Sequence, residues 1–350
     1  MISDPNPERT ELSELGEFGL IDRLTENISL LNPSTLKGVG DDAAVIDNQN
    51  KLTLVSTDLL IEGIHFDLTF TPLKHLGYKS AVVNFSDIYA MNGSPKQLFV
   101  GISVSNRFSA EALDELYSGI KLACKHYHVD LAGGDTTSSP QGLFLALTVT
   151  GVADKNKVVY RNTAKPNDLI CVSGDLGGAY MGLLLLEREK QVFLANPDMQ
   201  PDLQGHDYII GRQLKPEARK DIIESLDKAG ILPTSMIDIS DGLASEIMHI
   251  CKGSKAGCRI YEEKIPIDAM TVMTAEEFNI SPVTAAMNGG EEYELLFTVR
   301  MEDYEKIREI EGITVIGHIT GAEEGCNLVT GDNVLVEIKA QGFDHMKEKE

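Results

Sequence analysis

Aspartates beside glycine, serine or threonine recur along this chain, and they restrict how it can fold more than any other feature. The first example is Gly38-Val39-Gly40-Asp41-Asp42, a glycine turn that ends in two adjacent carboxylates. Two unit charges about 4 Å apart repel by about 4 kcal/mol at an effective dielectric constant near 20. A fold that gathers such segments therefore needs a cation between them. Hard oxygen ligands select Mg²⁺ or a similar ion, which proteins often share with a phosphate chain.

Further segments combine an acid with small or hydroxyl-bearing residues. They are Ser56-Thr57-Asp58, Asn84-Phe85-Ser86-Asp87, Gly133-Gly134-Asp135-Thr136-Thr137, Asp238-Ile239-Ser240-Asp241-Gly242 and Asn288-Gly289-Gly290-Glu291-Glu292-Tyr293-Glu294. Each segment alone has an ordinary structural explanation, such as a turn, a helix N-cap or a solvated charge run. Asp87 is the most informative, because it falls in a predicted helix beside apolar residues, where an unpaired carboxylate is costly. Together, the segments predict phosphate chemistry that uses metal ions.

Other kinds of nucleotide site are disfavoured. The pattern Gly38-x-Gly40-x-x-Ala43 resembles a dinucleotide fingerprint, but it precedes a predicted strand and carries two carboxylates where a pyrophosphate would lie. The chain contains no Gly-Lys dipeptide and so no Walker A motif, and it has no His-Arg-Asp, His-Glu-x-x-His or Gly-x-Ser-x-Gly motif. His65 fits a packed or exposed side chain as well as it fits a substrate contact. A nucleotide site here has to use metal ions and backbone groups.

Length and charge limit the class of protein. The 350 residues favour two domains, and 42% hydrophobic residues are enough for ordinary cores. The formal net charge of −23 disfavours nucleic acid and anionic membranes, which attract basic surfaces. The N-terminus lacks the pattern of a signal peptide, and the apolar segment 176–186 is too short to span a bilayer. We therefore expect a cytoplasmic protein with no membrane or nucleic-acid partner.

The cysteines support the same compartment. They stand at positions 124, 171, 251, 258 and 326, an odd number without a Cys-x-x-Cys pair. This pattern predicts reduced, buried thiols. Cys251 and Cys258 lie close to His249 in sequence, but their spacing matches none of the usual zinc patterns. Core packing is therefore the expected role of these two cysteines.

Periodicity predicts mixed helices and strands without strict β-α-β alternation, which favours α+β for the first half and mixed α/β for the second. Polar residues 154–168 predict the junction between domains 1–154 and 155–350, and residues 196–216 predict an insertion loop. Helices are expected over 17–31, 73–91, 110–127 (with Ser109 as N-cap), 175–189, 216–229, 243–251, 269–278, 282–287 and 304–311. Strands are expected over 43–46, 52–56, 97–104, 143–152, 169–172, 237–239, 258–261, 294–299 and 314–319, with a hairpin near 328–338.

The ordered set of motifs resembles the thiamine-monophosphate kinase family. The motifs are Gly-Val-Gly-Asp-Asp-Ala, Ser-Thr-Asp-x-x-x-Glu-Gly-x-His-Phe, Asn-x-Ser-Asp-x-x-Ala-Met, Gly-Gly-Asp-Thr-Thr, Ser-Asp-Gly-Leu and Gly-Gly-Glu-x-Tyr-Glu-Leu. Each is weakly specific, but the ordered series is strongly specific, and the resemblance runs from about Glu17 to Phe343. That family belongs to a superfamily of ATP-using enzymes related to aminoimidazole ribonucleotide synthetase, selenophosphate synthetase and a hydrogenase maturation factor.

The resemblance implies transfer of the ATP γ-phosphoryl group to thiamine monophosphate, which yields thiamine diphosphate and ADP. It implies the two-domain ATP-binding fold of aminoimidazole ribonucleotide synthetase, several Mg²⁺ ions, and a homodimer whose N-terminal domains pair near the nucleotide. Domain 1–154 would bind metal and ATP and form the dimer, and domain 155–350 would complete the active-site cleft. Glu292 stands where such enzymes often have Asp, which leaves Glu291 usable.

Motif positions carry the family's functional residues onto this sequence. The implied Mg²⁺ ligands are Asp42, Ser56, Thr57, Asp58, Asp87, Asp135, Asp238 and Asp241, with Asp87 and Asp241 also catalytic. The implied ATP contacts are Tyr117, Gly134, Asp135, Arg161 and Ser240, and the implied thiamine-phosphate contacts are His65, Glu291 and Phe343.

The chemistry needs no general base, because a phosphate acceptor has a second pKa of about 6 and is mostly ionised at neutral pH. It needs relief of the repulsion between two anions and their in-line alignment. Two alternatives remain open at this point. Another superfamily member would use a different acceptor, although the first cysteine here is Cys124, whereas selenophosphate synthetases carry a reactive Cys or Sec early in the chain. A non-catalytic acidic metal-binding protein would bind cations without consuming ATP.

Overall fold

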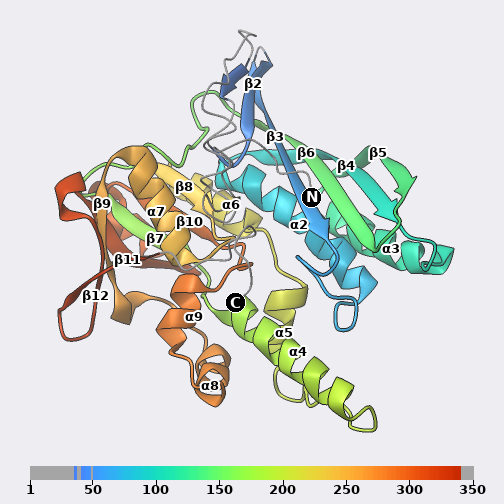
Figure 1. Ribbon diagram of the computed structural model, residues 1–350. Helices are drawn as coiled ribbons and strands as arrows, with labels where there is room; N and C mark the ends of the chain where they lie inside the picture. The colour runs from blue at the N-terminus through green and yellow to red at the C-terminus, as the bar shows by residue number, and fades with distance from the viewer. Residues whose placement is uncertain (1–34, 38–40, 49, 340–350) are drawn as a thin grey trace, which may run out of the picture.

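The computed structural model describes residues 35–37, 41–48 and 50–339 (Figure 1). The helix expected over 17–31, the glycines at 38 and 40, and Phe343 lie outside the described residues. Within the described part, the chain forms two sheets with helices packed against them. One sheet is built from residues up to Ala153 and the other from residues after Asp168, so the sheets divide at the polar segment 154–168.

The first sheet has the strand order β1-β2-β3-β6-β4-β5. All its pairs are antiparallel except β4 with β5. Helices α2 (Leu73–Ala90) and α3 (Ala110–Tyr127) pack against each other and cover one face (Figure 1). The strands are β1 (Thr35–Lys37), β2 (Ala44–Asn48), β3 (Lys51–Ile61), β4 (Ser94–Val104), β5 (Asp130–Ser138) and β6 (Leu143–Ala153).

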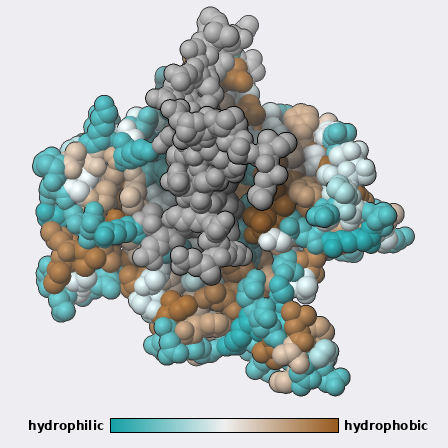
Figure 2. All heavy atoms as spheres, in the orientation of Figure 1, coloured by the Kyte–Doolittle hydropathy of each residue, from teal (hydrophilic) through white to brown (hydrophobic). Residues whose placement is uncertain are grey.

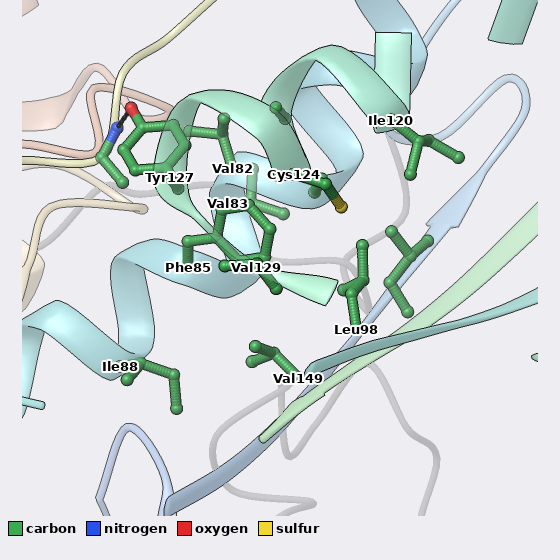
Figure 3. Packing of buried hydrophobic residues seen from close by; sticks show 14 of the residues in the cluster. Val82, Val83, Phe85, Ile88, Leu98, Ile120, Cys124, Tyr127, Val129 and Val149 are labelled. Carbon is green, nitrogen blue, oxygen red and sulfur yellow. Dashed lines mark hydrogen bonds between the residues drawn. The ribbon is translucent and has the colours of Figure 1, made fainter. Parts of the chain in front are cut away.

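Alternation along the strands directs one row of side chains into the core of this unit. The strand predicted over 143–152 is confirmed as β6, in which Leu143, Leu145, Leu147 and Val149 are all buried and the residues between them are not. Figure 3 shows Val149 and Leu98 of the sheet facing residues of α2 and α3. The predicted N-cap is also confirmed, since the Ser109 side chain accepts a hydrogen bond from the Ala112 N–H.

Two predictions about this sheet are wrong. Ser56-Thr57-Asp58 does not end a strand, because β3 continues to Ile61 and pairs with β6 along its length. The segment Gly133-Gly134-Asp135 is no turn but the middle of β5, which runs parallel to β4. Glycine is required there for close packing, since a Cβ at Gly134 would lie 2.0 Å from the Val100 carbonyl oxygen.

The second sheet has the strand order β13-β12-β9-β11-β7-β10-β8. Helix α7 (Leu243–Ser254) lies beside β9 and β8 (Figure 1). The expected hairpin near the end of the chain is confirmed as the antiparallel pair β12 and β13. The strands are β7 (Leu169–Ser173), β8 (Ser235–Asp238), β9 (Gly257–Tyr261), β10 (Leu295–Val299), β11 (Ile313–Thr320), β12 (Cys326–Val329) and β13 (Leu335–Glu337).

The segment 196–216 is not purely a loop, because α5 (Asp207–Leu214) forms within it and packs on α4. Its buried Ile209 and Leu214 give this helix an apolar side. The helix expected over 304–311 is shorter than predicted. The remaining helices are α4 (Gly178–Ala195), α6 (Lys220–Ala229), α8 (Ala269–Glu277), α9 (Pro282–Asn288) and α10 (Tyr304–Ile307), with 3₁₀ turns η1 (Glu262–Lys264), η2 (Met301–Asp303) and η3 (Ala322–Glu324).

The described helices include no candidate for a membrane span. None of them is both long and apolar enough to cross a bilayer. On the face shown in Figure 2, hydrophobic residues occur in separate groups among hydrophilic ones.

Contacts between the two units fix how they meet. The hydroxyls of Tyr78 and Tyr127 donate to Glu217 Oε2 at 2.6 and 2.7 Å. The Lys79 ammonium, which is buried, donates to the Gln213 carbonyl at 2.8 Å. Because Tyr78 and Lys79 lie on α2 while Gln213 and Glu217 belong to the second unit, α2 is the main bridge between them.

Candidate active site

Carboxylates from three separate segments meet where the two units join. Asp42 precedes β2, Asp87 lies in α2 and Asp238 ends β8, and one oxygen of each lies within 4.8 Å of the others. Asp87 is brought inward because the apolar face of α2 packs on the sheet, with Phe85 and Ile88 fully buried beside it. The sequence predicted each of these acids as a ligand, and the fold places all three at one point.

Strand β3 adds two more polar side chains from one face. The Ser56 hydroxyl donates to Asp87 Oδ2 at 2.5 Å. Asp58 lies two residues further along and therefore projects on the same side of the sheet as Ser56. Thr57 projects on the opposite side, where its hydroxyl donates to the Leu147 carbonyl at 3.2 Å and contacts Thr148. The Thr57 side chain therefore points away from the carboxylates, so any ligand oxygen from Thr57 has to come from its main chain.

Burial raises the pKa of every carboxyl in this group, and like charges raise it further for Asp42, Asp58 and Asp87. Burial is the main cause for Asp42 and Asp87, whose pKa values lie well above the usual range, and the neighbouring aspartates raise both further. Burial and the charge of Asp238 raise the pKa of Asp58 to about 7. Asp42 Oδ2 is also buried and accepts no hydrogen bond within the described residues. These carboxylate oxygens are hard ligands, and a bound cation would favour their ionised form. The group therefore fits a divalent cation of the Mg²⁺ type.

These shifts predict a stability that depends on both pH and Mg²⁺. The folded pKa of Asp58, about 7, exceeds its ordinary value of 3.8, so the folded state binds more protons between these values. In EDTA, the melting temperature should therefore fall as the pH is raised from about 5 to about 8. Excess Mg²⁺ should raise the melting temperature most at the higher pH, where the ionised carboxylates bind it. A thermal melt that is independent of pH in EDTA would contradict this coupling.

Arg161 supplies positive charge on one side of the cluster. Its Nη1 lies 3.9 Å from Asp42 Oδ1, and its Nε lies 3.8 Å from Asp41 Oδ1. The Lys37 ammonium is 3.8 Å from Asp41 Oδ2. Coulombic attraction to Arg161 lowers the pKa of Asp42 but does not offset its burial. Lys37 therefore pairs with Asp41, whereas Arg161 also attracts Asp42 and Asp238 without offsetting their burial.

Two loops of the second unit close over Asp238. The Glu291 N–H donates to the Ser240 carbonyl at 2.6 Å, and the Tyr293 N–H donates to the Ile239 carbonyl at 2.8 Å. Glu291 and Tyr293 have φ values of 63° and 54°, in the left-handed region that non-glycine residues rarely adopt. Such backbone strain is concentrated at functional sites. Residues 289–294 form the loop between α9 and β10.

Asp241 lies near the cluster without joining its closest members. Its N–H donates to Glu246 Oε1 at 3.0 Å, and the Ser240 hydroxyl reaches the same oxygen at 3.4 Å. Burial, followed by the charge of Asp241, raises the pKa of Glu246 well above its usual range. Neither Ser240 nor Asp241 caps α7, because Gly242 is its N-cap residue. Neither side chain is therefore used as a helix cap, which is compatible with the predicted roles of Ser240 in ATP binding and of Asp241 in metal binding.

Glu291 is held by residues that the sequence did not single out. Lys79 Nζ lies 3.0 Å from Glu291 Oε1, and Gln213 Nε2 donates to Glu291 Oε2 at 2.8 Å. A lysine within the apolar helix predicted over 73–91 was the available signal for Lys79. Gln213 gave none, because its segment was expected to be a loop. His65, in the turn after β3, accepts a hydrogen bond at Nδ1 from the Ile61 N–H at 3.1 Å.

The predicted nucleotide residues Tyr117, Gly134 and Asp135 line one cavity of about 440 Å³, together with Val100, Leu131, Ala132, Gly133 and Thr136. The Asp135 carboxylate accepts a hydrogen bond from the Thr136 N–H at 2.9 Å. Strands β4 and β6 separate β5 from β3, which places Asp135 about 14 Å from the Asp58 strand. Within one chain, Asp135 therefore lies apart from the cluster of Asp42, Asp87 and Asp238.

Comparison with known proteins covers almost the whole chain. The family model for the N-terminal domain of AIR synthase related proteins matches residues 40–153. A thiamine-monophosphate kinase of Buchnera aphidicola subsp. Schizaphis graminum is 36% identical over 95% of this chain and 99% of its own length. The enzyme of that name from Bacillus subtilis is 32% identical over 95% of this chain and 100% of its own length.

Solved structures agree with these sequence matches. AaThiL, solved with AMPPCP and TMP bound, has a TM-score of 0.81 and 29% identity over 97% of this chain and 99% of its own. Hydrogenase maturation protein HypE, solved with ATP, has a TM-score of 0.67 and 20% identity over 96% of this chain and 99% of its own, and shares the fold. The two-domain fold predicted from the sequence is thus confirmed.

Proposed function

The chain belongs to the thiamine-monophosphate kinase family, and from that premise we propose how its residues bring ATP and thiamine monophosphate together. The enzyme transfers the γ-phosphoryl group of ATP to thiamine monophosphate and yields thiamine diphosphate and ADP. Carboxylate oxygens of Asp42, Asp87 and Asp238 lie within 4.8 Å of one another. This observation is the main support for placing the reaction at these residues. A second functional assignment, as a hydrogenase maturation enzyme, is not favoured, because that likeness is limited to the fold.

We propose Mg²⁺ as the cofactor and Asp42, Asp58, Asp87 and Asp238 as its principal ligands, with the Thr57 carbonyl beside them. When bound, Mg²⁺ neutralises phosphate oxygens and lets two anions approach each other. Ser56 orients Asp87 by its hydrogen bond. Arg161, next to Asp42, would contribute a positive charge that attracts phosphate oxygens. Asp241 and Asp135 would join ligand sets further along the phosphate chain.

The acceptor side of the site is proposed at the strained loop. Glu291 is fixed by Lys79 and Gln213, so its carboxylate has a defined position beside Ser240. A fixed carboxylate suits the positively charged thiazolium ring of thiamine. The buried Lys79 ammonium balances the negative charge of Glu291 when no substrate is bound. His65 and Phe343 complete this proposed contact set. The acceptor phosphate is already ionised near neutral pH, so none of these residues needs to remove a proton.

The assignment predicts a strict requirement for a divalent cation. With ATP and Mg²⁺, ADP formation should depend on thiamine monophosphate, and chromatography should show thiamine diphosphate in equal amount. EDTA should reduce turnover to background, and excess Mg²⁺ should restore it. Thiamine, thiamine diphosphate, selenide and inorganic phosphate serve as the comparison acceptors. Undiminished activity in EDTA would rule out the metal role, and ADP formation with another acceptor alone would overturn the substrate assignment.

We further propose that the first unit pairs with a second copy through the face of its sheet that α2 and α3 leave uncovered. Leu59, Phe99 and Phe144 are 59%, 39% and 38% exposed there, although they belong to central strands. Exposed apolar side chains on a central sheet are typical of a surface that is covered in the assembly. The exposed segment Gly134-Asp135 on the edge strand β5 would then also lie near the partner.

Replacing Phe144 with aspartate should disrupt this pairing, because each interface would bury two unpaired charges. Light scattering at micromolar concentration should give the mass of a dimer for the unmodified chain and a monomer, or a dimer at least about 10-fold weaker, for Phe144→Asp. Leu335→Asp, which changes an exposed leucine on β13, is the matched control and should remain dimeric. A monomeric unmodified chain would contradict the proposal.

The proposal also covers the role of each unit and the cellular location of the protein. Residues 1–154 would bind metal and nucleotide and form the dimer, and residues 155–350 would contribute Asp238, Ser240 and Glu291. A cytoplasmic location is supported by the cysteines, because all five are described and none forms a disulfide.

A further inference from the structure

Three of the five cysteines converge in the second unit, far from the aspartates. Cys251 comes from α7, Cys258 from β9 and Cys326 from β12, and their sulfur atoms lie within 4.8 Å of one another. Cys258 and Cys326 are directly opposite each other in the parallel pairing of β9 with β12. Helix α7 lies beside β9 (Figure 1), and it contributes the third cysteine, Cys251.

We propose that Cys251, Cys258 and Cys326 form a binding site for a thiophilic cation, with Zn²⁺ as the expected occupant. A tetrahedral site with Zn–S bonds of about 2.3 Å holds its sulfurs about 3.8 Å apart. The sulfur atoms, already within 4.8 Å of one another, therefore need to move by less than about 1 Å to reach that geometry. Thiolates also favour Zn²⁺ over Mg²⁺, which selects oxygen ligands.

Cys251 and Cys258 belong to a hydrophobic cluster of the second unit and Cys326 packs against it, but core packing does not require three thiols within 4.8 Å of one another. The other two cysteines, Cys124 and Cys171, lie singly in different hydrophobic clusters. Cys251 and Cys258 are buried, whereas Cys326 is only partly buried and opens the group to solvent. Three thiols with one accessible side resemble a zinc site of three protein ligands whose fourth position takes water or a small thiol. Binding would displace the thiol protons to solvent and leave three thiolates around one dication.

This site is separate from the proposed active site. Strands β11, β7 and β10 lie between β9 and β8, which places Cys258 about 19 Å from the Asp238 strand. Cys251 and Cys258 alone fit no zinc spacing, because the third thiol comes from β12, much later in the chain. Occupation of the site would tie α7, β9 and β12 together, so we expect it to act on stability and not on phosphoryl transfer.

The test is a titration of the reduced full-length protein with Cd²⁺, in buffer that contains excess Mg²⁺ to occupy the carboxylates. Thiolate-to-Cd²⁺ charge transfer gives an ultraviolet band that oxygen ligands do not produce. The band should saturate at one equivalent per chain, and added Zn²⁺ should remove it. Cys326→Ser should weaken Cd²⁺ binding at least about 100-fold. Cys124→Ser, a matched control in another cluster, should leave the band unchanged.

The kinase activity of Cys326→Ser, expected to equal that of the unmodified chain, shows that the variant is folded. If Cys326→Ser does not fold, Cys251→Ala provides the same measurement at the helix position. No band at one equivalent, or a band that survives loss of Cys326 or Cys251, would overturn the proposal. Equal loss of the band in Cys124→Ser would do the same, because it would place the binding elsewhere.

Discussion

Replacing Asp87 with asparagine is expected to lower turnover by at least about 10³-fold while the protein stays folded. Asp87 is partly buried in α2, and one of its carboxylate oxygens lies within 4.8 Å of those of Asp42 and Asp238. An amide has no charge to hold Mg²⁺ against two anionic substrates, so the repulsion between those substrates returns in the transition state. The loss should appear in kcat more than in KM for thiamine monophosphate, because the charge matters most during transfer.

Stability should respond in the opposite direction. Burial and the neighbouring aspartates hold the pKa of Asp87 well above its usual range, so without a cation its charged form is disfavoured. Asparagine closely matches a protonated carboxyl in shape, and its carbonyl oxygen can accept the Ser56 hydroxyl. In EDTA, the melting temperature of Asp87→Asn should equal or exceed that of the unmodified chain. The stabilisation by Mg²⁺ should largely disappear.

Asp114→Asn is the control, because Asp114 is exposed on α3 and far from the cluster in the fold. It should keep its activity and its response to Mg²⁺. Near-normal turnover in Asp87→Asn would remove Asp87 from the proposed metal ligands. A variant that loses its activity and also its cooperative thermal transition would show instead that Asp87 is needed for folding.

Local patterns in the sequence predicted local structure well. The helical period placed Asp87 inside α2, and strict alternation identified the buried face of β6. Both signals are short-range, because they depend only on which side chains face the same core. The motif order then supplied the functional residues without giving distances between them. No local pattern shows that Asp42, Asp87 and Asp238 lie within 4.8 Å of one another, since that depends on how two sheets and a helix meet.

The wrong predictions share one physical cause, which is that tertiary pairing outweighs local preference. Gly133-Gly134 favours a turn by itself, but parallel hydrogen bonds with β4 hold it in a strand. Segment 196–216 contains many turn-forming residues, yet the packing of Ile209 against α4 stabilises α5 within it. Lys79 is equally unexpected inside an apolar helix. It is tolerated because Gln213 and Glu291 of the other unit satisfy its ammonium group.

The second large effect is expected from Arg212→Met, which should destabilise the protein by about 3–5 kcal/mol. Arg212 Nη2 lies 2.7 Å from Glu292 Oε2, and Nη1 lies 2.8 Å from Glu294 Oε1. Both glutamates are buried, with side-chain exposures of 0% and 1%. Glu294 also pairs with Arg219, whereas Arg212 is the one cation paired with Glu292 among the described residues. Methionine fills much of the same volume, so the loss reports the uncompensated charge of Glu292.

The loss should depend on pH in a defined direction. Burial already raises the pKa of Glu292 to about 7 from its ordinary 4.5, so its contribution to stability falls as the pH rises between these values. Removing Arg212 raises this pKa further, because the attraction of Arg212 lowers it in the unmodified chain. The deficit of the variant should therefore be smallest near pH 5 and should grow between about pH 6 and about pH 8.

Urea denaturation across this pH range measures that deficit directly. Arg300→Met is the matched control, because Arg300 pairs with Glu302 on the surface, and it should change stability by less than about 0.5 kcal/mol at any pH. Glu292 also accepts hydrogen bonds from the N–H groups of Gly177 and Ala179 at the start of α4. A displacement of Glu292 in the variant should therefore destabilise the start of that helix as well. A deficit below about 1 kcal/mol, or one that does not change with pH, would mean that water reaches Glu292 and that Arg212 is not its essential partner.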